Sequence, residues 1–172
     1  MLKIAYDLLY KHDLEKNHKF PMIKYKLIPE QLIIEKTCDP SSFFVPGNID
    51  NNVVIETHDV NYYNRLSNLE LNSKEIRAIG FPLSEALVRR EKKIVQGTIE
   101  TSLFALKYGV GMNIAGGTHH AFSNKAEAFC LLNDQSIAAN FLINNKFCKK
   151  ILILDLDVHQ GNGTAEIFKD SN

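Results

Sequence analysis

Two short stretches of the sequence concentrate side chains that could bind a metal ion or move protons. They are GGTHH at residues 116–120 and DLDVHQGNG at residues 155–163. In the second stretch Asp155, Asp157 and His159 are spaced by two, so an extended backbone would point all three to one side. Carboxylate and imidazole groups that converge in this way suit Zn²⁺.

Each motif has a simpler explanation when it is taken alone. A His-His pair is usually hydrogen-bonded within the fold or lies at the surface, and an Asp-x-Asp or a GNG is often a turn. Both motifs, however, follow apolar stretches that are typical of strands, at residues 112–115 and 151–156. Ligands of open parallel sheets collect at the carboxyl ends of strands, so the joint occurrence favours one shared site.

The apolar pattern predicts the strands that would carry these motifs. Residues 151–156 form a continuous apolar run closed by acids, which is typical of a strand covered by helices on both faces. Shorter strands are expected at residues 3–6, 52–56 and 112–115. Since strands alternate with helices, we expect an α/β fold with a largely parallel sheet.

Two helices are predicted from apolar residues at three- and four-residue steps. The longer one covers residues 84–108, where Ser84 can cap the start and Gly109 can end the helix. Gly97 lies inside it and should cost about 1 kcal/mol relative to alanine, unless it allows close packing. Residues 134–144 predict a second helix, and the proline-interrupted segment 12–46 predicts short helices mixed with loops.

The composition indicates one folded, charge-balanced unit. The chain has 172 residues, 45% of them hydrophobic, with 20 Lys plus Arg against 20 Asp plus Glu. A net charge of zero gives no electrostatic reason to expect a nucleic-acid or anionic-membrane partner. No apolar run approaches bilayer length and the first ten residues do not resemble a signal peptide, so we expect a cytoplasmic protein. Three cysteines without CxxC spacing predict reduced thiols.

Three blocks of the sequence resemble consecutive active-site blocks of the histone deacetylase family. They are GGTHHAF at 116–122, AFCLLND at 128–134 and DLDVHQGNGT at 155–164. HKFPMIKY at 18–25 is similar to the class IV branch and its bacterial relatives. The resemblance spans essentially the whole chain. It implies a zinc-dependent deacetylase with the three-layer αβα fold of the arginase/deacetylase superfamily.

The resemblance assigns roles to residues by position. Asp157 and His159 correspond to two zinc ligands, and His120 corresponds to the general base that takes a proton from the zinc-bound water. His119 is the neighbouring histidine that assists charge stabilisation, and Asp155 is the carboxylate that orients it. The backbone around the three residues of the Asp-x-Asp-x-His run also resembles the family's potassium site.

The remaining assignments concern the substrate tunnel and one neighbour of the base. Phe129 would form a wall of the acyl-lysine tunnel with Cys130 near its floor, and Gly117 is placed in the same tunnel. Ala128 stands where the family often has glycine, and its methyl group would crowd the pocket. Asn162 stands where some branches have aspartate. A neutral amide stabilises an imidazolium less, so the base should be more readily neutral.

The resemblance also implies missing parts. The family's third zinc ligand, an aspartate, and its oxyanion-stabilising tyrosine come from later strands, and residues 1–172 contain neither block. We therefore expect the N-terminal portion of a single deacetylase-like domain, truncated and inactive alone. Two C-terminal strands would separate the strand that ends at Asp155 from the one that ends near Ala115. Without them the sheet should be only marginally stable.

Other functions stay open at this point. The chain could be a non-catalytic remnant, one half of a split enzyme with a separate C-terminal half, or another single-metal amidohydrolase of the arginase-like fold. The arginase-like branch binds two Mn²⁺ ions through Asp-x-His-x-Asp, and Gly161 in place of the second aspartate argues for one metal. The substrate could be acetyl-lysine on proteins, a fatty-acyl lysine, or a small acetylated amine such as an acetylated polyamine.

Overall fold

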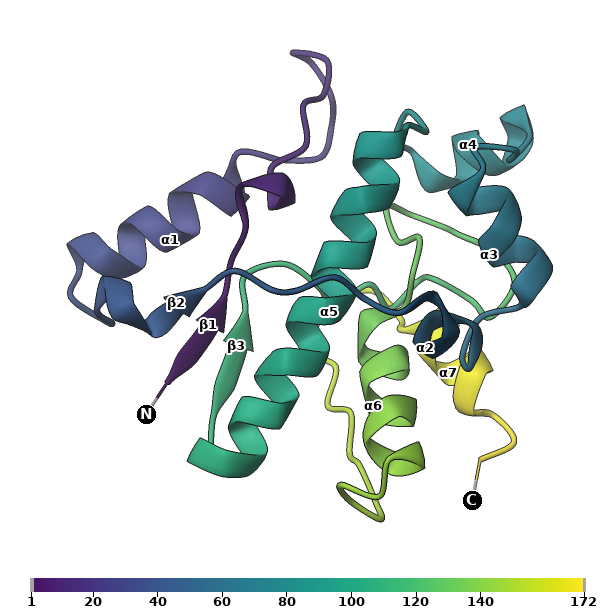
Figure 1. Ribbon diagram of the computed structural model, residues 1–172. Helices are drawn as coiled ribbons and strands as arrows, with labels where there is room; N and C mark the ends of the chain where they lie inside the picture. Colours follow the sequence, from purple (N-terminus) through teal and green to yellow (C-terminus); the bar gives the residue numbers. More distant parts are fainter. Residues whose placement is uncertain (1, 172) are drawn as a thin grey trace.

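A small parallel sheet forms one side of the molecule in the computed structural model, which describes residues 2–171 (Figure 1). Its strands β1 (Lys3–Ala5), β2 (Phe43–Phe44) and β3 (Gly111–Asn113) lie in the order β2-β1-β3 and pair in parallel. The register places the buried Ile4 of the central strand opposite Met112 of β3. The α/β class and the parallel pairing predicted from the sequence are confirmed.

The long helix α5 (Glu85–Tyr108) packs against this sheet. The Ser84 side chain accepts a hydrogen bond from the backbone N–H of Leu87, and Gly109 ends the helix in the left-handed conformation. Both ends therefore lie where the predicted caps put them. On another side α5 packs against α6 (Asp134–Asn144), whose bounds also match the prediction. These two helices connect the sheet to the loops that carry the chemistry.

Gly97 explains how α5 comes so close to the sheet. A Cβ atom at this position would collide with the hydroxyl group of Tyr10 and the side-chain amide of Asn113 on β3. The absence of a side chain allows the close packing that the sequence left open. The gain in packing offsets the helix-propensity cost of about 1 kcal/mol.

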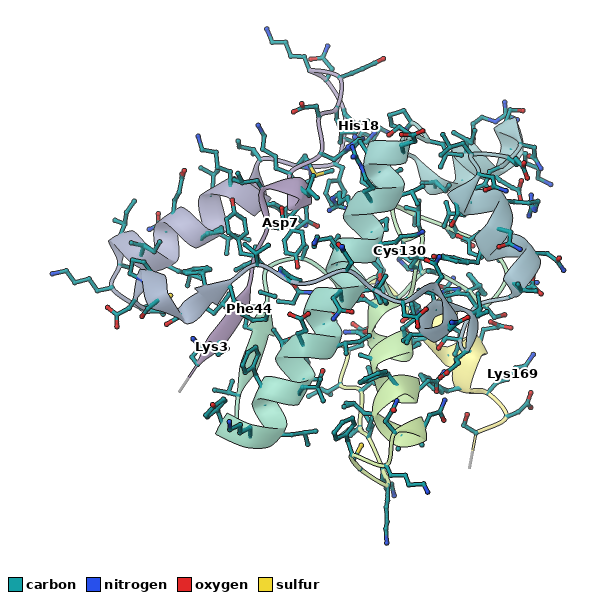
Figure 2. The ribbon with its side chains drawn as sticks, in the orientation of Figure 1. Lys3, Asp7, His18, Phe44, Cys130 and Lys169 are labelled. Carbon is teal, nitrogen blue, oxygen red and sulfur yellow. The ribbon has the colours of Figure 1, made fainter. Side chains whose placement is uncertain are left out.

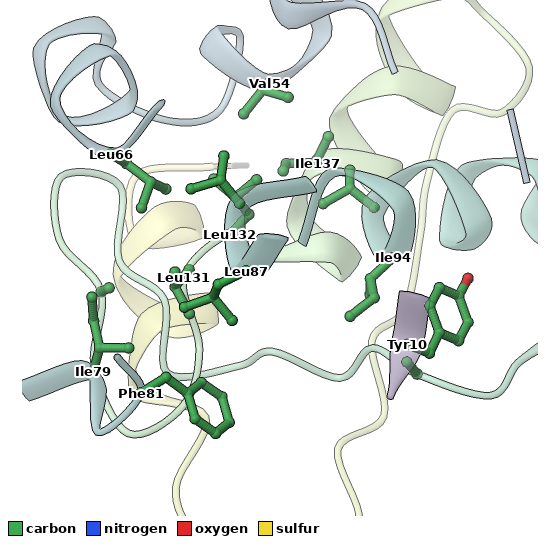
Figure 3. Close-up of a cluster of buried hydrophobic side chains, with 14 of the residues drawn as sticks. Tyr10, Val54, Leu66, Ile79, Phe81, Leu87, Ile94, Leu131, Leu132 and Ile137 are labelled. Carbon is green, nitrogen blue, oxygen red and sulfur yellow. The ribbon is translucent and has the colours of Figure 1, made fainter. Parts of the chain in front are cut away.

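The hydrophobic core surrounds α5 and extends from the sheet to the shorter helices (Figure 3). Each large apolar side chain that is fully buried contributes roughly 1.5–3 kcal/mol to folding. The labelled members in Figure 3 are Tyr10, Val54, Leu66, Ile79, Phe81, Leu87, Ile94, Leu131, Leu132 and Ile137. Because Leu131 and Leu132 belong to the loop before α6, the core anchors that loop directly.

Short helices complete the fold. They are η1 (Leu8–Tyr10), α1 (Lys24–Ile34), η2 (Pro40–Ser42), α2 (Asn51–Ile55), α3 (Val60–Ser67), α4 (Ser73–Ile79) and α7 (Asn162–Phe168). The mixture over residues 12–46 follows the prediction. In residues 2–171 no helix combines the length and apolarity that crossing a membrane requires.

The strand predicted at 52–56 is wrong, because this segment belongs to α2. Its β-branched run of Val53, Val54 and Ile55 suggested a strand. The Asp50 side chain instead accepts a hydrogen bond from the backbone N–H of Asn52 and caps a helix. Val54 is fully buried, Val53 packs half-buried against the core and Ile55 is exposed, so local capping outweighs β propensity here.

The buried strand predicted at 151–156 is also wrong. This segment has no assigned strand, and no backbone hydrogen bond joins it to a strand within residues 2–171. Leu152, Leu154 and Leu156 are 87%, 71% and 85% exposed, whereas Ile151 and Ile153 are half-buried. The side chains still alternate as in a strand. A ladder needs a neighbour, however, and no other strand lies beside this segment among the described residues.

Candidate active site

The two chemical motifs of the sequence meet in space. Nδ1 of His119 lies 2.6 Å from Oδ2 of Asp155, which confirms the predicted contact between them. His119 is buried, and the hydrogen bond from its ring lowers the pKa of the Asp155 carboxyl. The carboxylate is therefore ionised at neutral pH and holds the proton of His119 on Nδ1.

His120 has a neutral partner. Its Nδ1 lies 2.7 Å from the side-chain oxygen of Asn162, at the start of α7. An amide oxygen only accepts, so Nδ1 carries the proton, and Nε2 of the neutral ring is left with its lone pair. The ring centroids of His119 and His120 are 4.1 Å apart, and the His159 ring lies 6.1 Å from that of His120. Three imidazoles thus gather at one place.

The predicted metal ligands lie side by side at the surface. Oδ1 of Asp157 accepts hydrogen bonds from the backbone N–H and from Nδ1 of His159, at 2.7 and 2.9 Å. The backbone bond, and then the ring bond, lower the pKa of the Asp157 carboxyl. Their side chains are 51% and 72% exposed. A carboxylate oxygen and an imidazole nitrogen are ligand types that zinc accepts, and these two lie close enough to bind the same ion.

The number of ligands falls short of a catalytic zinc site. Such sites have three protein ligands. Within residues 2–171, no group of three or more His, Cys, Asp or Glu side chains is placed to hold a metal ion. Zinc and potassium binding therefore stay predictions.

A pocket of about 370 Å³ opens between the two motifs. Its lining includes seven of the nine predicted site and tunnel positions, and the other two, Asp155 and Asn162, stand behind the two histidines. The predicted residues that line it are Gly117, His119, His120, Phe129, Cys130, Asp157 and His159. The structure thus brings the predicted residues to one place, while their roles stay predictions.

Comparison with known proteins identifies the family. Residues 14–172 match the histone deacetylase domain. The chain belongs to the histone deacetylase family. An uncharacterized protein of Picosynechococcus sp. is 38% identical over 167 residues, which cover 97% of this chain and 56% of that protein. Histone deacetylase 2 of Arabidopsis thaliana is 27% identical over 175 residues, which cover 98% of this chain and 45% of that protein.

A third relative is the acetoin utilization protein AcuC of Staphylococcus aureus. It is 26% identical over 183 residues, which cover 99% of this chain and 47% of that protein. The chain thus spans about half the length of these curated relatives.

Solved structures show the same fold. A histone deacetylase homologue from Aquifex aeolicus superimposes with a TM-score of 0.83 at 27% identity, covering 99% of this chain and 48% of that one. A homologue complexed with SAHA gives a TM-score of 0.82 at 28% identity, with the same coverage. The arginase/deacetylase-like fold is confirmed, while the class IV assignment stays a prediction.

A carboxylate beneath the histidine pair holds this deacetylase-like loop. Asp134 accepts hydrogen bonds from the backbone N–H and hydroxyl of Thr118, at 2.9 and 2.6 Å, and from the Thr98 hydroxyl at 2.6 Å. Gly116, at φ 126°, has no room for a Cβ atom beside this carboxylate. The sequence placed Asp134 only at a helix start. Its contribution depends on tertiary contacts that spacing does not show.

Phe129 is aimed into the pocket by a strained turn. Ala128 and Phe129 have φ values of 47° and 68°, between Glu127 and Cys130, which exchange backbone hydrogen bonds of 3.1 and 2.9 Å. The two backbone N–H groups of the turn also donate to carbonyl groups at the end of α4. Side chains at positive φ cost roughly 1–2 kcal/mol each. Ala128 is thus a strained position as well as part of the pocket lining.

Two aromatic residues of the N-terminal segment, together with Phe81 between α4 and α5, surround the Phe129 ring. Its centroid lies 5.1 Å from that of Phe20, 5.0 Å from that of Phe81 and 6.0 Å from that of His18. His18 lies beside the N-terminal end of α5 (Figure 2), and its Nε2 is 2.8 Å from the carbonyl oxygen of Gly80. From this N-terminal segment, Phe20, Lys24 and Tyr25 also line the pocket.

Two buried groups beside the pocket have opposite chemical character. Cys130 lies toward the middle of the molecule (Figure 2), and burial raises the pKa of its thiol to about 12, so it is unreactive at neutral pH. Arg90 also lines the pocket, forms a buried ion pair with Glu91 and donates from Nε to the carbonyl oxygen of Tyr10 at 2.7 Å. Sequence reasoning missed this pair.

Proposed function

We propose that this chain supplies the general-base side of a zinc-dependent deacetylase that hydrolyses acetyl-lysine or a small acetylated amine. The main support for this proposal is that the two histidines at 119–120 lie close to Asp155, Asp157 and His159 around one pocket. Membership of the family and the SAHA-complexed structural relative support the proposal.

The two histidines divide the proton chemistry. Nδ1 of His120 donates its proton in a hydrogen bond to the Asn162 side-chain oxygen. Nε2 is therefore free to accept a proton from a water molecule in the pocket. His119 has the ionised Asp155 behind it, which stabilises positive charge on its ring and fixes its orientation. A neutral base beside a histidine that tolerates charge suits hydrolysis of an amide.

Asp157 and His159 are the residues that would hold zinc. Zinc held there would supply Lewis-acid polarisation of the acetyl carbonyl and would lower the pKa of a water molecule in the pocket. We propose that a third ligand and an oxyanion donor come from residues other than 2–171, in the same polypeptide or a separate C-terminal half. One observation supports the alternative of a non-catalytic remnant: the two proposed ligands are exposed, on a segment without a strand neighbour in residues 2–171.

Loss of the base tests the proposal. In a preparation with the complete deacetylase domain, His120→Ala should lower kcat for an acetyl-lysine peptide about 10²-fold or more, the usual scale for general-base loss. His12→Ala, at a histidine outside the pocket lining, is the matched control. Chelation should abolish the activity of the unmodified protein and added zinc should restore it. A His120→Ala variant with unchanged kcat would contradict the assignment of the base.

A further inference from the structure

A buried histidine outside the pocket joins three segments of the fold. His58 lies between α2 and α3 and is 2% exposed. Its Nδ1 lies 3.2 Å from the carbonyl oxygen of Ser123, and its Nε2 lies 3.0 Å from the backbone nitrogen of Asn133. A carbonyl oxygen accepts and an N–H group donates, so the ring is neutral with its proton on Nδ1. Burial lowers the pKa of His58 to about 4, in agreement with this state.

The Asn133 side chain reaches the residues that flank the general base and its partner. Its Nδ2 donates to the carbonyl oxygen of Ala121 at 3.0 Å and to the hydroxyl oxygen of Thr164 at 3.1 Å. Ala121 directly follows His120, and Thr164 stands two residues after Asn162. One asparagine therefore ties together the two chain segments that make the hydrogen bond between base and amide.

The other ring nitrogen secures the far end of the same loop. The carbonyl oxygen of Ser123, which faces Nδ1 of His58, also accepts the backbone N–H of Asp59 at 2.8 Å. The backbone N–H of Ser123 donates to Glu166 of α7 at 3.1 Å. The loop after the histidine pair is thus fixed at both ends, once directly and once through Asn133.

We propose that His58 is a positioning residue for the His120–Asn162 pair and acts through the backbone N–H of Asn133. The proposal rests on the proposed function in so far as His120 is the base. If Nε2 is removed, the buried N–H of Asn133 loses its acceptor, and an unpaired buried donor is costly. The loop relieves that cost by moving Asn133, and the residues beside the base move with it.

Two substitutions separate the two hydrogen bonds of His58. His58→Gln places its amide oxygen near the position of Nε2 and keeps an acceptor for Asn133. His58→Asn places its amide nitrogen near the position of Nδ1, keeps a donor for Ser123 and leaves Asn133 unpaired. Tyr62→Phe is the matched control, because it removes a neighbouring buried hydrogen bond of 2.7 Å to the carbonyl oxygen of Leu131.

The readouts are the imidazole ¹⁵N resonances of His120 and steady-state kinetics, both on the complete domain. His58→Asn should shift these resonances and lower kcat about tenfold at unchanged KM, as misplacement of a reacting group does. The kcat of His58→Gln should stay within about twofold of that of the unmodified protein. Tyr62→Phe should lower thermal stability and leave kcat and the His120 resonances unchanged.

Three outcomes are decisive. Unshifted His120 resonances in His58→Asn, or equal losses in the Gln and Asn variants, would overturn the positioning role and leave only packing. Separation of the two variants in both readouts would support it. If the unmodified protein does not deacetylate, the proposed function fails, and the resonances alone still decide the role of His58.

Discussion

The active-site residues differ in how firmly the fold holds them. His119 is buried and bonded to Asp155, whereas Asp157 and His159 are exposed and bond mainly to each other. The residues proposed for proton transfer are therefore built into the body of the protein. The residues proposed to bind the metal lie at its surface.

Removal of a ligand should act on metal content before anything else. In the complete domain, Asp157→Ala leaves His159 without its carboxylate neighbour, and zinc bound per protein should fall from about one to well below one. Asp13→Ala, an acid outside the pocket lining, is the control. Metal analysis after gel filtration measures the ratio, and full occupancy in Asp157→Ala would refute its role as a ligand.

Among the elements, the turn at residues 128–129 departs most clearly from the backbone conformation that its residue types prefer. Two side chains occupy the left-handed region, and the end of α4 and an aromatic cluster hold them there. Strain of this kind persists only where surrounding contacts dictate the backbone. The Phe129 ring is the side chain that this turn places in the pocket lining.

Relief of that strain should stabilise the fold. Ala128→Gly should raise the free energy of unfolding by up to about 1 kcal/mol, because glycine adopts positive φ freely. Ala165→Gly, at an exposed site in α7, should lower it by about 1 kcal/mol. Urea unfolding of both variants measures the two changes. Equal destabilisation by both would show that the turn is not strained.

Local signals predicted some elements and not others, for physical reasons. Ser84 and Gly109 fixed the ends of α5 because caps act within a few residues. The run at 151–156 was wrongly predicted as a buried strand, because a strand exists only with a neighbour, which local sequence cannot supply.

The candidate site divides in the same way. The His119–Asp155 contact was predictable from the resemblance, because both residues fall in blocks that match the family's active-site blocks by position. The contributions of Asp134, His58 and the Arg90–Glu91 pair were not, because burial of a polar group depends on partners far along the chain.

At the scale of the whole molecule, an uncovered apolar edge stands out. Leu152, Leu154, Leu156 and Val158 all face outward from one segment without a strand neighbour in residues 2–171. Exposed apolar edges of this kind favour association between copies.

The isolated 172-residue chain should therefore self-associate and show a weak thermal transition. Leu154→Lys should shift the association equilibrium toward monomer, whereas Leu106→Lys, at an exposed leucine of α5, should leave that equilibrium nearly unchanged. Sedimentation velocity over a range of concentrations measures the fractions of monomer and oligomer. A monomeric unmodified chain with a sharp transition that deacetylates an acetyl-lysine peptide would contradict this expectation and the proposed need for further residues.

The absence of a strand neighbour among residues 2–171 also bears on the affinity that we propose for zinc. Asp157 and His159 continue directly from the segment at 151–156. Any fraction of molecules in which that segment is displaced would therefore lack the converged pair of donor atoms. The apparent dissociation constant equals the intrinsic one divided by the fraction in which the segment is in place. A strand paired with this segment would therefore tighten zinc binding without touching the ion. By thermodynamic reciprocity, zinc would tighten the pairing of that strand by the same factor.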